Sequence, residues 1–161
     1  MQSDGKHREH IPAKRFVPTI NYVSDILGHC PHMAPIRIRT LLVDALLNDG
    51  KAIPGADDLV FATAPYETLK IYLTWPGYTG CEMLIPINLY AGNDCPSRGS
   101  VVSQIAMLFV KFMESCKPRR LHPTAEKWRI ADKGLNARNV FFNHLVNTHE
   151  NVWQVDCDII V

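Results

Sequence analysis

Apolar and polar residues alternate on both sides of a short break between Leu69 and Tyr90, where the sequence reads LKIYLTWPGYTGCEMLIPINLY. The two apolar rows consist of Leu69, Ile71, Leu73 and Trp75 before the break and Met83, Ile85, Ile87 and Leu89 after it. Two rows of period two around a break that contains Pro and Gly predict a β-hairpin. Pro86 has no N–H group to donate, so we expect the second strand to lie at the edge of a sheet.

The clearest helical pattern covers residues 101–116, after a loop that ends at Ser100. The apolar stripe of this segment consists of Val101, Val102, Ile105, Leu108, Phe109 and Phe112. Because the stripe is wide, we expect a well buried helix. Ser100 is the expected N-cap, and Pro118 helps to end the helix.

Three further elements are expected between this helix and the last residue. Residues 126–131 predict a short strand centred on Trp128 and Ile130, and a turn follows them. Residues 136–146 predict one or two helical turns. In these turns the expected cap is Asn136, and the expected buried side chains are Val140, Phe141 and Leu145. Residues 152–161 alternate again and predict a closing strand.

The first 66 residues carry weaker signals. Residues 1–20 are polar and basic without an apolar period, so we expect a flexible tail. Residues 36–39 alternate like a strand, whereas residues 41–46 have helical spacing and are followed by Gly50 as a C-cap. The remainder, up to residue 66, contains Gly, Pro and Asp and is expected to be mostly loop.

From residue 69 onward the expected order is strand, turn, strand, long helix, strand, helical turn and strand. This order, with its closing segment KWRIADKGLNARNVFFNHLVNTHENVWQVDCDIIV, resembles the ubiquitin-like β-grasp over about residues 69–161. The resemblance implies a strand containing Pro86 at the sheet edge and a last strand that runs parallel to the first. A different α+β sheet packed on one helix would fit the same order.

We therefore expect an α+β fold in which a β-grasp-like mixed sheet packs on one long helix. The expected organisation is a single domain over residues 21–161. Within it, residues 67–161 form the β-grasp-like core, and residues 21–66 form an N-terminal elaboration that we expect to be a helical extension.

Three short motifs carry a second resemblance. WPGY at residues 75–78, WRI followed by GL at residues 128–135, and VWQV at residues 152–155 are similar to motifs of uncharacterised proteins from mushroom-forming fungi. Those proteins have W-P-G-Y, W-x-V-G-x-x-G-I and S-W-Q-P, so Ala131 and Val155 depart from their pattern. The resemblance implies a fungal source and no activity.

The composition excludes several classes of protein. The 161 residues are 47% hydrophobic, which is enough for a core, and the net charge of +1 argues against a general affinity for nucleic acid. No apolar run approaches the length of a membrane span, and no apolar stretch follows the N-terminal charges as in a signal peptide. We expect an intracellular protein, in the cytoplasm or the nucleus.

The five cysteines are widely spaced, odd in number and form no CxxC pair, which is typical of reduced thiols. His29, Cys30 and His32 are the weak candidates for a metal site. Zinc needs about four ligands, usually from two pairs, and no second pair is present. We therefore predict neither a metal nor another cofactor. Cys81 and Cys95 are the cysteines expected to be exposed. Either could serve a hydrolase or transferase as the nucleophile.

The leading hypothesis is a non-enzymatic protein–protein interaction module that can self-associate into a homo-oligomer. Its expected surface is the exposed strand edge at residues 82–89, where strand addition can occur. The binding residues expected there are Trp75, Tyr78, Pro86 and Asn88. One alternative is a small cysteine-dependent hydrolase or transferase. The other is a nucleic-acid binder that uses the basic segment 117–129, where Lys117, Arg119, Arg120 and Trp128 lie close in sequence.

Overall fold

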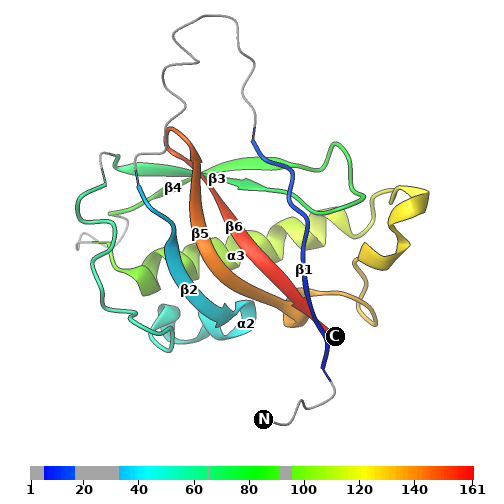
Figure 1. The fold of residues 1–161 in the computed structure, drawn as a ribbon, viewed down its shortest axis with the longest axis horizontal. Coiled ribbons are helices and arrows are strands. Elements are labelled where there is room, and N and C mark those ends of the chain that lie inside the picture. The colour runs from blue at the N-terminus through cyan, green and yellow to red at the C-terminus, as the bar shows by residue number, and fades with distance from the viewer. Residues whose placement is uncertain (1–5, 17–32, 65, 91–95) are drawn as a thin grey trace, which may run out of the picture.

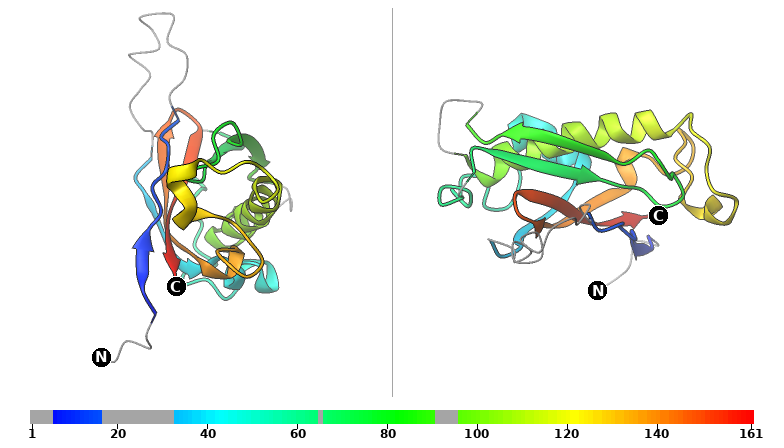
Figure 2. Two further views of the ribbon diagram at one scale, coloured as in Figure 1. Left: turned by 90° about the vertical axis from the view of Figure 1, so that its right-hand side faces the viewer. Right: turned by 90° about the horizontal axis from the view of Figure 1, so that it is seen from above.

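The computed structural model describes residues 6–16, 33–64, 66–90 and 96–161. It is a mixed α+β fold in which a six-stranded sheet packs one face against a single long helix, α3 (Arg98–Cys116) (Figures 1 and 2). The α+β class with one long helix is therefore confirmed.

The sheet has the order β2-β5-β6-β3-β4, and β1 also pairs with β6. The strands are β1 (Arg8–His10), β2 (Ile36–Leu41), β3 (Thr68–Leu73), β4 (Met83–Asn88), β5 (Val140–His149) and β6 (Val152–Ile160). The short helical elements are α2 (Leu42–Ala45) and the 3-10 turns η1 (Leu47–Gly50), η2 (Pro123–Trp128) and η3 (Ala137–Asn139).

The predicted hairpin is present as β3 and β4, which pair antiparallel from Thr68 opposite Asn88 to Leu73 opposite Met83. The apolar row of β3 is buried toward α3, and β4 lies at the end of the sheet order, as Pro86 predicted. β6 runs parallel to β3, but only Lys70 and Ile71 of β3 pair with it. Figure 1 shows the reason, since β3 and β4 cross β5 and β6 at a steep angle.

Helix α3 begins earlier than the sequence analysis expected. Its N-cap is Ser97 rather than Ser100, and the two serines form a reciprocal capping box. The Ser97 Oγ atom accepts a hydrogen bond from the Ser100 backbone N–H, and the Ser100 Oγ atom accepts one from the Ser97 N–H. The predicted stripe is buried at Val101, Val102, Ile105, Phe109 and Phe112, whereas Leu108 is half-buried.

β5 occupies a segment that we expected to be mostly helical. Asn136 does cap a helical turn, η3, but Val140–His149 then continues as a ten-residue strand. A β-bulge lies between Phe142 and His144. It changes the spacing of buried residues from two to three at this point, which imitates the spacing of a helix. Residues 126–131 also differ from expectation, because they end the η2 turn and contribute only an isolated bridge from Ile130 to Leu135.

The N-terminal segment is part of the sheet. Residues 8–10 form β1, antiparallel to the last residues of β6, and Ile11 is buried, which corrects the expected flexible tail over the described residues 6–16. β1 and β3 share one edge of β6, because β5 covers the other edge along its whole length. Residues 6–16, which we call the arm, therefore occupy the edge of β6 beyond the point where β3 diverges from it.

The described part of the expected N-terminal helical extension combines a strand with short helical turns. β2 adds to the sheet beside β5, and only α2 and η1 follow it as short helical turns. The alternation of residues 36–39 and the helical spacing of residues 41–46 are therefore both confirmed. The alternation marks a strand whose isoleucines face the core while its arginines face outward.

Candidate functional site

The loop between β3 and β4 holds two of the predicted binding residues, and both are buried. Trp75 is 4% exposed and Tyr78 is 2% exposed. The Trp75 Nε1–H donates to the Trp128 carbonyl at 2.7 Å, and the Tyr78 hydroxyl accepts from the Ile130 backbone N–H at 2.9 Å. The expectation that these aromatics present a binding surface is corrected, because both polar tips are used to hold residues 128–130.

Two of the three short motifs, WPGY and WRI, therefore meet in space. The Trp75 and Trp128 rings pack edge to face with their centroids 6.3 Å apart, and Trp75 packs in the same way on Phe109 of α3. Gly77 has a positive φ of 86°, and a Cβ atom there would lie 2.5 Å from Leu121 and Ala125. The loop therefore packs tightly against the segment that follows α3 and connects it to the hairpin.

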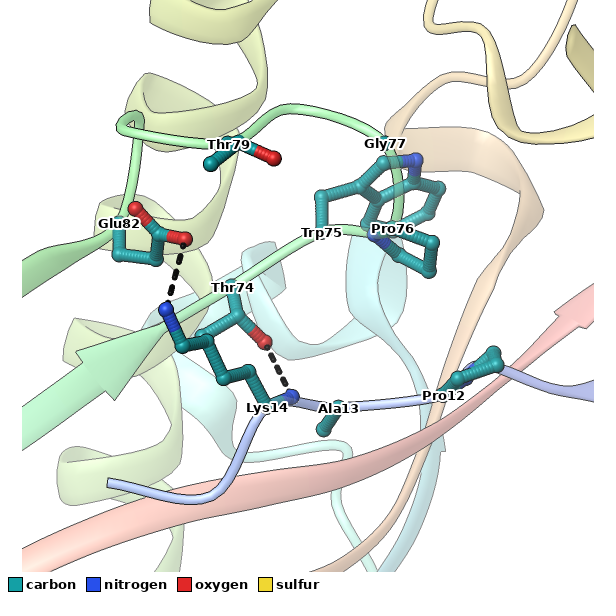
Figure 3. Close-up of a pocket in the computed structure, with 9 residues that line it drawn as sticks. All are labelled: Pro12, Ala13, Lys14, Thr74, Trp75, Pro76, Gly77, Thr79 and Glu82. Atoms are coloured by element: carbon teal, nitrogen blue, oxygen red, sulfur yellow. Dashed lines mark hydrogen bonds and ion pairs between the residues drawn. The ribbon is translucent and has the colours of Figure 1, made fainter. Parts of the chain in front are cut away.

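A pocket of about 300 Å³ lies beside this loop, between it and the arm (Figure 3). The arm contributes Pro12, Ala13 and Lys14, and the hairpin contributes Thr74, Trp75, Pro76, Gly77, Thr79 and Glu82. The Lys14 ammonium lies 3.6 Å from the Glu82 carboxylate, and the Lys14 backbone N–H donates to the Thr74 hydroxyl at 3.3 Å. These contacts neutralise the two charged residues of the pocket and join the arm to the hairpin.

Gln154 holds the arm from the other side. Its buried side-chain amide accepts from the Phe16 N–H and donates to the Lys14 carbonyl, both at 2.9 Å. The sequence analysis did not identify this contact. No local pattern marks it, because Gln154 belongs to the polar row of the closing strand together with Asp156 and Asp158.

The predicted edge residues Pro86 and Asn88 are exposed on β4. Leu84 and Tyr90, which are 41% and 40% exposed, lie on the same segment. The Asn88 side-chain oxygen accepts from the Tyr90 N–H at 2.8 Å and so turns the chain at the end of the strand. This edge is therefore the part of the predicted surface that the structure exposes.

The cysteine chemistry is not supported where the structure describes it. Cys81 is buried, which corrects its expected exposure, and Cys95 lies outside the described residues. Burial, and then the neighbouring Cys81 thiol, raise the pKa of the Cys116 thiol to about 12. Burial, with Asp156 and Asp158 nearby, also raises the pKa of Cys157 well above its usual value. A thiol needs its thiolate form to act as a nucleophile, so Cys116 and Cys157 are unreactive at neutral pH.

The metal candidates His29, Cys30 and His32 lie outside the described residues. Within the described ranges, no group of three or more His, Cys, Asp or Glu side chains could hold a metal ion. Likewise, no helix in these ranges is long and apolar enough to cross a membrane.

Three of the five Lys and Arg residues in the basic segment 117–129 are paired with carboxylates. Lys117 pairs with Asp132, and this hydrogen bond raises the Lys117 pKa. Lys127 pairs with Glu9 of the arm. Trp128 is half-buried against Trp75, so its ring is only partly available for stacking on a base. Arg119 and Arg120 are exposed and have no ion-pair partner among the described residues, so the nucleic-acid surface stays a prediction.

Comparison of the chain with protein-family models, with curated proteins and with solved structures finds no match.

Proposed function

We propose that the chain is a non-catalytic protein-interaction module that associates with a second copy of itself through the outer edge of β4. The observation that carries this proposal is the composition of the edge, because β4 has no charged residue from Met83 to Asn88. Proteins commonly protect exposed edge strands with charged side chains or bulges. β2, at the opposite end of the sheet order, has both, since it carries Arg37 and Arg39 and a register shift between Arg37 and Thr40.

The backbone of β4 supports the same proposal. The Leu89 N–H donates to the Glu67 carbonyl at 2.9 Å, so alternate residues before Leu89 bond toward β3. The backbone groups of Leu84, Pro86 and Asn88 therefore point away from the sheet. Leu84 and Asn88 each offer an N–H and a carbonyl, whereas Pro86 offers only a carbonyl.

A two-fold axis at Pro86 would use all of these donors. It places Leu84 of one copy opposite Asn88 of the other, and the two such pairs form about four hydrogen bonds. The exposed Leu84 and Tyr90 side chains add apolar contact area, and the uncharged strand meets its copy without repulsion. Because Pro86 leaves the centre of this ladder unbonded, we expect a weak dimer.

We also propose that residues 68–160 form a β-grasp. Three features support this assignment, namely the order β4-β3-β6-β5 within the sheet, the position of α3 between the two hairpins, and the parallel pairing of β3 with β6. In this arrangement β4 is an edge strand, which agrees with its proposed role in self-association.

Sedimentation velocity over a range of concentrations tests the proposal. The unmodified chain should show a reversible monomer–dimer equilibrium in the micromolar range. Leu84→Lys should be monomeric, because two ammonium groups would face the same short interface. Pro86→Val should associate more tightly, because it supplies the missing N–H donor.

Met107→Lys is the matched control, since Met107 is an exposed apolar residue (53% exposed) that belongs to α3 and not to β4. It should leave the equilibrium unchanged. A chain that stays monomeric at every concentration, or equal effects of the two lysine substitutions, would contradict the proposal.

A further inference from the structure

A second pocket, of about 460 Å³, lies at the opposite edge of the sheet and is lined by three arginines. Arg37 and Arg39 come from β2, and Arg98 is the first residue of α3. Ile38, Pro54, Gly55 and Asp58 complete the lining. Three guanidinium groups and one carboxylate leave two positive charges in excess, which is unusual for a chain whose net charge is only +1.

A β-bulge brings the two strand arginines to this pocket. Residues 38 and 39 of β2 oppose a single residue of β5, and Arg39 has a φ of 57°. This left-handed conformation is unfavourable for arginine and is found mainly at Gly or Asn. Bulges of this kind redirect a side chain, often next to a binding site. Among the described residues, neither the Arg37 nor the Arg39 side chain has a hydrogen-bond or ion-pair partner.

Only the Nη1 atom of the Arg98 guanidinium has hydrogen-bond partners among the described residues. Its Nη1 atom donates to the Gly55 carbonyl at 3.0 Å and to the Asp58 carboxylate at 2.7 Å. A Cβ atom at Gly55 would lie 2.0 Å from that Nη1 atom, so the position of the guanidinium depends on this glycine. The Arg98 Nε–H is buried without a hydrogen-bond partner in the described part of the chain. The Nη2 group also has no partner among the described residues, so the guanidinium retains N–H donors that these contacts do not use.

The backbone N–H groups at the start of α3 are already paired and are not available to bind an anion. The Arg98 N–H donates to the Asp58 carbonyl and the Gly99 N–H donates to the Ala56 carbonyl. The Ser100 N–H is taken by Ser97. Any anion in this pocket would therefore be bound by the arginine side chains.

We propose that the three-arginine pocket binds the phosphoryl group of a small molecule. Guanidinium groups bind phosphate oxygens through paired N–H donors, and a phosphate monoester carries nearly two negative charges at neutral pH. This charge matches the two excess positive charges of the lining. The pocket is also larger than one phosphate group, which leaves room for an organic portion against the exposed Pro54.

Isothermal titration of the full chain at constant ionic strength tests the proposal, with inorganic phosphate and phenyl phosphate as probes. We expect saturable binding of at least one probe. Tighter binding of phenyl phosphate identifies a phosphate ester as the ligand class, and tighter binding of inorganic phosphate identifies the free anion. Arg39→Asn and Arg37→Gln should each weaken binding about tenfold or more, because each removes charged hydrogen bonds.

The variants separate binding from folding. Asn tolerates a φ of 57°, so Arg39→Asn should unfold at the same temperature as the unmodified chain or higher while it loses affinity. Arg37→Gln changes a position of regular strand geometry and provides a second, independent reading. Arg120→Gln, at an exposed arginine outside this pocket, should bind both probes normally. Absence of saturable binding, or undiminished affinity in both pocket variants, would overturn the proposal.

Discussion

At the scale of single residues, the aromatic side chains of the β3–β4 loop stabilise a joint between distant segments. Trp75 and Tyr78 each contribute an apolar ring to the core and a polar tip to the backbone of residues 128–130. Trp and Tyr can do both when their N–H or O–H finds a buried partner. Their exposure could not be judged from sequence, because a loop rich in Pro and Gly is usually at the surface.

Tyr78→Phe tests this structural role. The substitution keeps the ring but leaves the Ile130 N–H buried without an acceptor. We expect the free energy of unfolding to fall by about 1–3 kcal/mol. Urea denaturation measures the change. Tyr90→Phe is the control at an exposed tyrosine and should stay within about 0.5 kcal/mol of the unmodified chain. Equal stability of the two variants would show that the Tyr78 hydroxyl is not used in the fold.

The raised pKa of Cys116 predicts that the free energy of unfolding falls at alkaline pH. Because burial and the Cys81 thiol raise its pKa to about 12 in the folded chain, the folded state retains a proton that the unfolded state loses from about pH 9. The contribution to stability is therefore complete below pH 9 and is lost as the pH rises toward 12.

The measurement is the free energy of unfolding between pH 8 and pH 10.5, for the unmodified chain and for Cys116→Ala. The substitution lowers stability at every pH because it leaves a cavity, but it should also make the decline with pH shallower. Identical slopes for the two proteins would mean that the Cys116 thiol does not titrate differently on folding.

At the scale of elements, local patterns predicted the strands and the helix wherever the backbone is regular. The β3–β4 hairpin, α3 and β6 follow from their periods of two or three to four residues. β5 did not, because the bulge after Phe142 places Leu145 where a helix would bury it. The arm was not predicted either, because its strand has only three residues, all of them polar, and so shows no apolar period in the sequence.

Gln154→Leu tests how the arm is attached. The substitution keeps the side-chain volume but removes both hydrogen bonds to the backbone of residues 14 and 16. We expect the Phe16 amide to exchange with solvent about tenfold faster, since roughly 1 kcal/mol of protection is lost. Amide hydrogen exchange followed by NMR measures this rate.

The Ile11 amide provides an internal reference for the same experiment, because it donates to the Cys157 carbonyl and not to Gln154. Its exchange should change little. Gln104→Leu on α3 is the matched control and should leave both amides protected. An unchanged Phe16 rate in Gln154→Leu would mean that other contacts hold the arm.

At the scale of the whole molecule, the sheet has two edges of different character. The β2 edge carries arginines, a bulge and the pocket that we propose to bind a phosphoryl group. The β4 edge is uncharged and is interrupted only by Pro86, and we propose that it pairs with a second copy. The middle of the sheet is completed by the arm, which covers the part of β6 that β3 leaves open. The two proposed activities therefore lie at opposite ends of one sheet and can be tested separately.

The sequence by itself determined the α+β class, the hairpin with its proline-marked edge, the long helix and the closing strand, because each depends on the local spacing of apolar residues. Only the tertiary structure decided which polar and aromatic side chains are exposed. Burial of Trp75 and Tyr78 depends on residues about 50 positions away. The arm pairs with a strand about 150 positions later, and the arginine pocket joins β2 to the start of α3. Contacts between residues so far apart produce no periodic pattern in the local sequence, so only the folded structure shows them.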